Sequence, residues 1–289
     1  MSYPNFVPRA TFDVSALRSV KWYPHHMHKG LLRLRELAKK CDCLIELRDA
    51  RIPRSSSNYN LTTMIPFPIP RVVAYNKKDL AEEAYSKKLI ESDSLMIKSS
   101  LTNDIDRLML RVRDLAPGSR KLLVIGIPNV GKSSLINALR RRGLQSGRRN
   151  AVPVGKLPGV TQHAGQLVRI HEDPSIYVLD TPGICLPNYE HDVVAGLRVA
   201  MTGGILDAAI DALSVADFSL FELNRLHKFN YVQEFGLEAP TNEINELIVT
   251  GVKKHNSYFK NGYPDQARLL QIFLRSIRDG RLGKLTLDR

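Results

Sequence analysis

One short stretch constrains the fold of this chain more than any other feature: residues 126–133 read GIPNVGKS. The pattern GxxxxGK[ST] requires a buried strand before it and a helix after it, because backbone N–H groups must converge on phosphates at a helix N-terminus. The apolar run KLLVI precedes the loop and the helical pattern SSLINALRR follows it. These neighbours predict a strand–loop–helix unit within an α/β domain.

The loop residues predict a binding site for the phosphates of a nucleotide. Lys132 is expected to neutralise the β- and γ-phosphate oxygens, and the hydroxyl of Ser133 is expected to bind Mg²⁺. The predicted phosphate-binding residues are Asn129, Val130, Gly131, Lys132, Ser133 and Ser134.

A second motif, DTPG, ends the apolar run IYVL and begins at Asp180. An acid at the tip of a buried strand is suited to hold Mg²⁺ through water. The amide of Gly183 can approach a γ-phosphate closely because glycine has no side chain. Thr161 lies between the two motifs, where a mobile loop would supply a hydroxyl to Mg²⁺. The alternative for Thr161 is an ordinary loop threonine.

A third motif, NKKD, follows the apolar run VVAY. Asp79 would accept the N1–H and the exocyclic amine of guanine, whereas adenine offers no donors there and would leave the carboxylate unpaired. The stem of Lys77 would cover the base, and Asn76 would tie adjoining loops together. Ser99 and Ser100 are candidates for the loop that contacts the guanine O6. The sequence therefore predicts binding of GTP and GDP with Mg²⁺.

Short apolar runs alternate with helical patterns over the first two thirds of the chain. The apolar runs lie at residues 44–47, 72–75, 122–125 and 176–179, and the helical patterns at 29–40, 81–91, 103–115 and 133–142. This alternation predicts an α/β fold with a mostly parallel sheet and helices on both faces. The patterns after Gly183 are all helical, so a second, smaller helical domain is expected.

The charge balance indicates a polyanionic partner. The chain carries 42 Lys and Arg against 29 Asp and Glu, a formal net charge of +13. Such an excess favours nucleic acid first and an anionic membrane surface second, with a generically basic soluble protein as the alternative. Basic runs occur at Arg140, Arg141, Arg142, Arg148 and Arg149, and again at Arg268, Arg275, Arg278, Arg281 and Lys284.

Two classes of protein are disfavoured by composition. No apolar run reaches the roughly 18 residues of a membrane span, so no transmembrane segment is expected. The three cysteines form neither paired zinc knuckles nor an even disulfide set, which indicates a reducing compartment. Residues 1–21 are basic and lack clear periodicity, which is compatible with an organellar transit segment or an N-terminal extension.

The order of the motifs is rotated, because NKKD precedes the phosphate loop whereas conventional GTPases carry it last. With this order, the segment WYPHHMHKG from Trp22, the stretch DARIP from Asp49 and the loop GIPNVGKSSLIN, the chain resembles the YlqF/RbgA family of circularly permuted GTPases. The regions LINALRRR and ADFSLFELNRLHKFNYVQEFGL and the ending RDGRLGKLTLD are similar to the mitochondrial, ribosome-associated branch of that family.

The resemblance implies an architecture and a role. Residues 22–189 would form the circularly permuted GTP-binding domain, and residues 190–289 a helical domain that binds RNA or the ribosome. The protein would be a monomer that hydrolyses GTP and helps assemble the large ribosomal subunit in the mitochondrial matrix, with peripheral contact to the inner membrane as a further option. The alternatives are a membrane-associated GTPase and a nucleotide-gated binding module with negligible turnover.

The resemblance also implies how hydrolysis is achieved. Ile184 stands after DTPG, where Ras-like enzymes place a water-orienting glutamine, and its side chain forms no hydrogen bond. The family assigns Asn129 to holding K⁺ and matches His26 to a histidine proposed to assist hydrolysis. We therefore expect slow intrinsic turnover that K⁺ and the ribosome stimulate. His25 departs from the family pattern, which has glycine there, so a surface or RNA-facing histidine cluster is the alternative.

Overall fold

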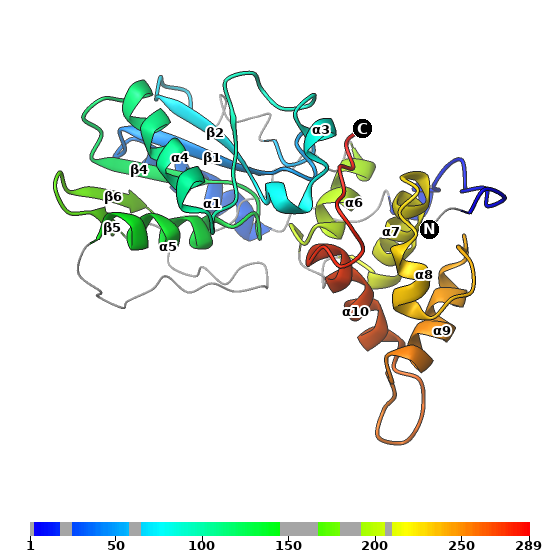
Figure 1. Cartoon of the computed structure of the whole chain (residues 1–289). Coiled ribbons are helices and arrows are strands. Elements are labelled where there is room, and N and C mark those ends of the chain that lie inside the picture. Colours follow the sequence, from blue (N-terminus) through cyan, green and yellow to red (C-terminus); the bar gives the residue numbers. More distant parts are fainter. Residues whose placement is uncertain (1–2, 18–24, 58–64, 145–166, 180–191, 206–209) are drawn as a thin grey trace. The chain divides into compact units, whose positions relative to one another are not determined.

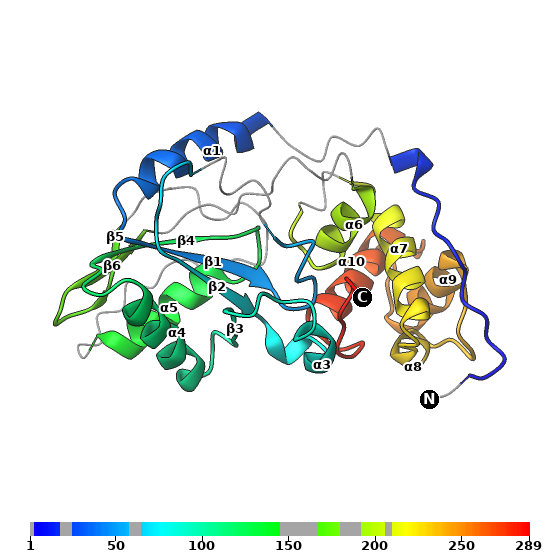
Figure 2. The same ribbon diagram turned by 90° about the horizontal axis from the view of Figure 1, so that it is seen from above.

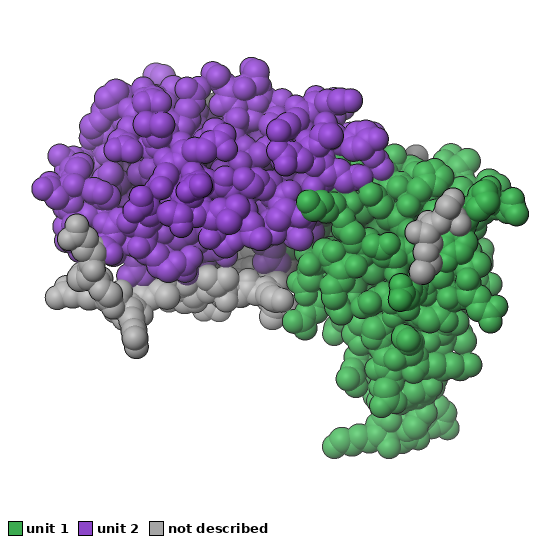
Figure 3. Space-filling view, in the orientation of Figure 1, with its two compact units in different colours: residues 1–22, 189–287 green, residues 23–188, 288–289 purple. Residues whose placement is uncertain are grey.

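The computed structural model describes residues 3–17, 25–57, 65–144, 167–179, 192–205 and 210–289. The chain divides into two compact units, which Figure 3 shows in different colours. The sheet unit contains residues 23–188 and 288–289, and the helical unit contains residues 1–22 and 189–287.

The sheet unit is built on a six-stranded sheet in the order β3-β2-β1-β4-β6-β5. The strands are β1 (Cys43–Asp49), β2 (Arg71–Asn76), β3 (Leu95–Met96), β4 (Lys121–Ile125), β5 (Leu167–His171) and β6 (Ile176–Leu179). All neighbouring pairs are parallel except β5 and β6, which are antiparallel. The predicted α/β class with a mostly parallel sheet is therefore confirmed.

Helices cover both faces of this sheet, as expected for a parallel sheet whose strands are buried on both sides. Figures 1 and 2 show α1 on one face and α4 and α5 on the other. In the described part of the unit the helical elements are α1 (His25–Ala38), η2 (Lys78–Leu80), α3 (Glu83–Ser86), α4 (Thr102–Leu115) and α5 (Lys132–Gly143).

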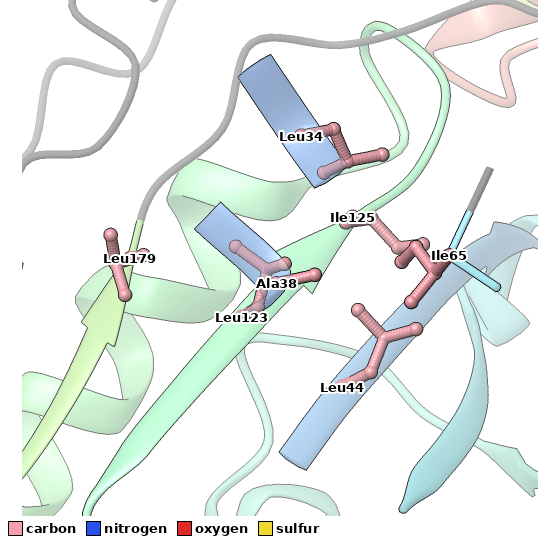
Figure 4. Packing of buried hydrophobic residues seen from close by; sticks show 7 residues of the cluster. All are labelled: Leu34, Ala38, Leu44, Ile65, Leu123, Ile125 and Leu179. Carbon is pink, nitrogen blue, oxygen red and sulfur yellow. The ribbon is translucent and has the colours of Figure 1, made fainter. Parts of the chain in front are cut away.

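The core on the α1 side explains why that helix holds its position. Leu34 and Ala38 are one turn apart on α1, so they face the sheet together. They pack into a buried cluster with Leu44, Leu123 and Ile125 (Figure 4). Leu34 is 1% exposed, and truncating such a leucine to alanine typically costs about 2–5 kcal/mol. The α1 contact therefore contributes substantially to the stability of the sheet unit.

Three details of the sheet unit differ from the sequence expectations. Strands β3 and β5 were not predicted, and the helical pattern at 81–91 gives only the short helix Glu83–Ser86. Glu91 pairs with Arg48 at 2.8 Å. This ion pair joins the end of the pattern to the sheet, where tertiary contacts rather than local preference set the backbone.

Within the described residues of the helical unit, five α-helices pack around an aromatic core. The helices are α6 (Val193–Met201), α7 (Ala212–Arg225), α8 (Asn230–Phe235), α9 (Ile244–Lys254) and α10 (Gln266–Arg278). Phe218, Phe235 and Phe273 are almost completely buried, and the last two meet edge to face with ring centroids 5.3 Å apart. No helix within the described ranges combines the length and the apolar character that crossing a membrane requires.

The N-terminal residues pack against this helical core. Arg9 forms a two-pronged ion pair with Asp217, with Nη2–Oδ1 and Nη1–Oδ2 distances of 2.7 and 3.1 Å. The ring of Phe12 meets those of Phe218 and Phe221 at centroid distances of 5.2 and 5.7 Å. A short 3₁₀ helix, η1 (Ser15–Leu17), follows. The sequence did not predict these contacts.

The end of the described chain passes from the helical unit back into the sheet unit. Leu285 and Leu287 are buried in the helical unit. Asp288 then accepts hydrogen bonds from the backbone N–H groups of Arg54 and Ser55 at 2.7 and 2.9 Å. The guanidinium of Arg289 lies 4.3 Å from the ring centroid of Tyr85. The two units are therefore linked by three passages of the chain.

Candidate functional site

The sheet topology itself marks the place where a ligand is expected. From β1 the chain moves outward to β2 and β3, and it then returns to the other side of β1 with β4 and β6. In open α/β sheets, ligands bind outside the carboxyl ends of the strands at such a switch point. The loops that follow β1, β2 and β4 all leave from this edge because the three strands are parallel.

The loop after β4 has a backbone that only small or tolerant residues adopt. Gly126 and Gly131 have φ values of 153° and 105°, and Asn129 is left-handed at 55°. A Cβ on Gly126 would lie 2.2 Å from the carbonyl oxygen of Leu47, and one on Gly131 would lie 2.4 Å from Nδ2 of Asn76. The glycines therefore let the loop fold tightly against the neighbouring backbone and side chains directly before the N-terminus of α5.

Lys132 begins α5 and turns its side chain back over the loop. It is 6% exposed, and its Nζ donates to the carbonyl oxygens of Gly126 and Ile127 at 3.1 and 2.9 Å. Ser133 and Ser134 follow in the first helical turn and are half-buried. A cation, backbone amides and hydroxyls thus lie together at a helix N-terminus, which is the chemistry of a phosphate site.

Asn76 connects three loops at the end of β2. Its Nδ2 donates to the carbonyl oxygen of Val130 at 2.9 Å. Its Oδ1 accepts from the backbone N–H and the hydroxyl of Ser99 at 3.1 and 2.9 Å. Asn76 and Ser99 are buried and Ser100 is exposed. The structure therefore brings the NKKD segment, the phosphate loop and the Ser99 loop together, although they are far apart in the chain.

Asp79 lies at the surface of this assembly. Its side chain is 39% exposed, and its Oδ2 lies 3.0 Å from Nζ of Lys98. Asp104 anchors the same region, because it accepts from Nζ of Lys78 and from the backbone N–H of Lys98, both at 2.7 Å. The carboxylate of Asp79 is thus held at the rim of the site on a fixed backbone and remains accessible to a ligand.

Lys77 is held by a buried carboxylate that sequence reasoning missed as a site residue. Nζ of Lys77 lies 3.0 Å from Oδ2 of Asp49, which also receives Nη2 of Arg51 at 2.8 Å. Burial by itself would raise the pKa of Asp49, but the charges of Arg51 and Lys77 outweigh it and hold the pKa well below its usual range. An acid at the last position of a buried strand, directly before a turn, was the available signal.

Several predicted site residues lie outside the described residues. Thr161, Asp180 and Gly183 belong to this group, and the side chain of His26 does also, although its backbone lies in α1. Ser133 is the predicted Mg²⁺ ligand within the described part of the chain, and its place beside Lys132 in the first turn of α5 fits that role. Among the described residues, no three His, Cys, Asp or Glu side chains gather as a metal site.

Comparisons with known proteins agree with this geometry. Residues 121–252 match the family described as "50S ribosome-binding GTPase". The chain is 32% identical to Mitochondrial GTPase 1 of Aedes aegypti, over 97% of both chains. It is 32% identical to Mitochondrial ribosome-associated GTPase 1 of Mus musculus, over 97% of this chain and 94% of the relative. Ribosome biogenesis GTPase A of Bacillus cereus is 31% identical over 93% of each.

Solved structures show the same fold. The GNP-bound YlqF of T. maritima matches with a TM-score of 0.61 at 22% identity, covering 89% of this chain and 96% of that one. The GDP-bound form of the same protein gives 0.59 at 21% identity. At these identities the likeness concerns the arrangement of the elements, including the rotated order in which the NKKD segment precedes the phosphate loop.

Proposed function

The chain belongs to the YlqF/RbgA family of circularly permuted GTPases and is a GTP hydrolase, and from this premise we propose that it acts in assembling the large subunit of the mitochondrial ribosome. The observation that carries the proposal is near-full-length similarity, at 32% identity, to proteins named for mitochondria and for ribosome association. The net charge of +13 supports an RNA-rich partner.

Nucleotide recognition is proposed to use the three loops that Asn76 joins. Asp79 reads the guanine edge, Lys77 covers the base, and Ser99 with Ser100 frames the base from the third loop. The amides of Asn129, Val130 and Gly131 hold the phosphates with Lys132.

Mg²⁺ would be held by Ser133, Thr161 and Asp180, and when bound it supplies positive charge to the β- and γ-phosphates. Lys132 adds a cation that is already fixed within the loop. Ser134 lies next to Ser133 in the same turn, and Gly183 would sense the γ-phosphate.

We further propose that K⁺ held by Asn129, together with His26, compensates for the missing glutamine at Ile184. Asn129 lies at the middle of the loop, and its backbone is left-handed, with φ of 55°. Hydrolysis measured in K⁺ and in Na⁺ at equal ionic strength tests the cation, and equal rates would reject it. Thermal stability measured in both salts controls for a general effect of the ion.

The ribosomal role is tested with Lys132→Ala in cells, because this change removes the cation of the phosphate site. Particles that accumulate are expected to be immature large subunits. Lys87→Ala is the matched control, since Lys87 lies in an exposed ion pair with Glu83. A normal subunit profile in cells whose Lys132→Ala protein has lost hydrolysis would contradict the assembly role.

A further inference from the structure

A short hairpin connects α9 and α10 in the helical unit. Its two arms are joined by hydrogen bonds from Phe259 N–H to the Tyr263 carbonyl oxygen at 2.8 Å and from Asp265 N–H to the Ser257 carbonyl oxygen at 2.9 Å. Gly262, with φ of 85°, permits the turn between them. Figure 1 shows this segment, in orange, extending beyond the ends of both helices. We call residues 257–265 the α9–α10 hairpin.

Two aromatic rings lie on one side of this hairpin. Phe259 and Tyr263 are opposite each other in the antiparallel pairing, so their side chains point to the same side. They are 53% and 69% exposed, and neither packs against another aromatic ring in the part of the chain that the structure describes. Opposite residues have Cβ atoms about 5 Å apart, so the rings form one aromatic surface.

Exposed basic residues lie at the hairpin tip and at the ends of the two helices that the hairpin joins. Lys260 lies at the hairpin tip, Lys253 and Lys254 end α9, and Arg268 lies in the first turn of α10. The nearby acid, Asp265, caps α10 by accepting from the backbone N–H of Arg268 at 2.9 Å. The hairpin therefore combines apolar π faces with an excess of positive charge.

We propose that the α9–α10 hairpin binds unpaired RNA, with bases stacked on Phe259 and Tyr263 and phosphates held by the flanking lysines. Aromatic faces beside basic groups are the usual means of binding single strands, because every base has a π face. Insertion into a membrane fits less well, since the tip carries Lys260, Asn261 and Gly262 and no apolar side chain. The identification of this RNA as part of the large ribosomal subunit rests on the proposed function.

The test uses the whole protein with GDP and a labelled oligouridylate of about ten nucleotides, a length within the range of a single binding site. Fluorescence anisotropy compares wild type with the double variant Phe259→Leu/Tyr263→Leu, which keeps apolar side chains and removes the π faces. Val249→Ala is the matched control, because Val249 is 57% exposed on α9 and is not aromatic. The duplex of the same strand with oligoadenylate is the second ligand, and phosphatidylserine vesicles are the third.

The double variant is expected to bind the single strand roughly tenfold or more weakly, with duplex binding changed less than about twofold and Val249→Ala unchanged. Lys260→Ala should lower the salt slope of log affinity by about 0.7. Equal binding of the single strand by wild type and double variant overturns the proposal. If the double variant loses binding to vesicles but not to RNA, the hairpin is a membrane contact and the RNA proposal is rejected.

Pelleting with purified large subunits separates this inference from the proposed function. If wild type binds oligouridylate through the rings but does not pellet with large subunits, the ribosomal role fails and the RNA site stands. If it pellets with subunits and the double variant binds oligouridylate as tightly as wild type, the RNA site fails and the ribosomal role stands.

Discussion

Lys77 and Asp49 are joined by an ion pair of 3.0 Å between Nζ of the lysine and Oδ2 of the aspartate. The pair connects the NKKD segment to the end of the neighbouring strand β1, where Asp49 is opposite Asn76 in the parallel register. Lys77 has a left-handed backbone, with φ of 61°. Asp49 therefore fixes the direction of a side chain whose own backbone is in a strained region.

We expect Asp49→Asn to weaken GDP binding roughly tenfold, because one charge-assisted hydrogen bond that orients Lys77 is worth about 1.5–3 kcal/mol. Titration with a fluorescent GDP analogue measures this loss. In a protein that already carries Lys77→Met, Asp49→Asn should lower the affinity for GDP little further, because the lysine that Asp49 orients has been removed. Asp106→Asn, which alters an exposed ion pair with Arg142, is the control. Additive losses in the double variant would show that Asp49 does not act through Lys77.

The stability given by Asp49 is expected to depend on pH. Its pKa is lowered in the folded protein, so the unfolded chain takes up the proton first as pH falls. The contribution is fully present above about pH 4, the ordinary aspartate range, and is lost as pH falls toward the folded pKa. Urea unfolding of wild type and Asp49→Asn should give a difference in unfolding free energy that is constant near pH 7 and shrinks below about pH 4. A constant difference down to pH 2.5 would contradict the assignment.

Gly131→Ala is expected to abolish nucleotide binding, because its Cβ would lie 2.4 Å from Nδ2 of Asn76 and would displace the side chain that joins the three loops. Gly118→Ala is the matched control, since Gly118 also has positive φ, at 78°, but an added Cβ meets nothing within 4 Å. Both variants carry the cost of about 1–2 kcal/mol for a left-handed non-glycine residue. GDP affinity should therefore fall only for Gly131→Ala, and equal losses in the two variants would refute the role of the contact.

Asp288→Ala should destabilise the sheet unit by about 1–3 kcal/mol, because it leaves the buried N–H group of Ser55 and the part-buried N–H group of Arg54 without their acceptor. Asp114→Ala, at an exposed position on α4, serves as the control. Thermal unfolding followed in the presence and absence of GDP reports the sheet unit specifically, since the nucleotide stabilises only that unit. An unchanged transition in both conditions would contradict the expectation.

Arg9→Ala is expected to lower the stability of the helical unit by about 1–2 kcal/mol through loss of the two-pronged ion pair with Asp217 and of packing over Phe12. Lys39→Ala removes an exposed pair with Glu36 and should change stability by less than about 0.5 kcal/mol. Chemical unfolding with near-ultraviolet circular dichroism, which follows the aromatic core, measures the effect. Equal stability of the two variants would mean that residues 3–17 do not support the helical unit.

Local patterns were sufficient for much of the fold. The runs that became β2, β4 and β6 have continuous apolar centres, as strands buried on both faces require. β1 also carries the buried charges Glu46 and Arg48, which pair with each other at 2.7 Å. The phosphate loop and NKKD could be placed at one edge of the sheet because both follow such strands. The geometric link through Asn76 follows from that placement.

Other features depend on contacts that a local pattern does not contain. Strand β5 is an edge strand with alternating exposure, so its signal is weaker than that of a central strand. The ion pair between Arg9 and Asp217 joins residues 208 positions apart. Asp49 appeared in the sequence as part of a family stretch, and its role became visible only when the parallel register set it beside the NKKD segment.

Neither compact unit is a continuous stretch of sequence, and this has a consequence for how the protein is made. Residues near the beginning of the chain can form their native contacts only after α7 has been synthesised. Arg54 and Ser55 can donate their hydrogen bonds only after Asp288 has been synthesised. During translation, therefore, neither unit reaches its final contacts as an isolated early product, and partly folded nascent chains must be kept from aggregating until synthesis has passed residue 288. Fragments divided at the boundary between the sheet and the helices would each lack residues of the unit that they are meant to contain.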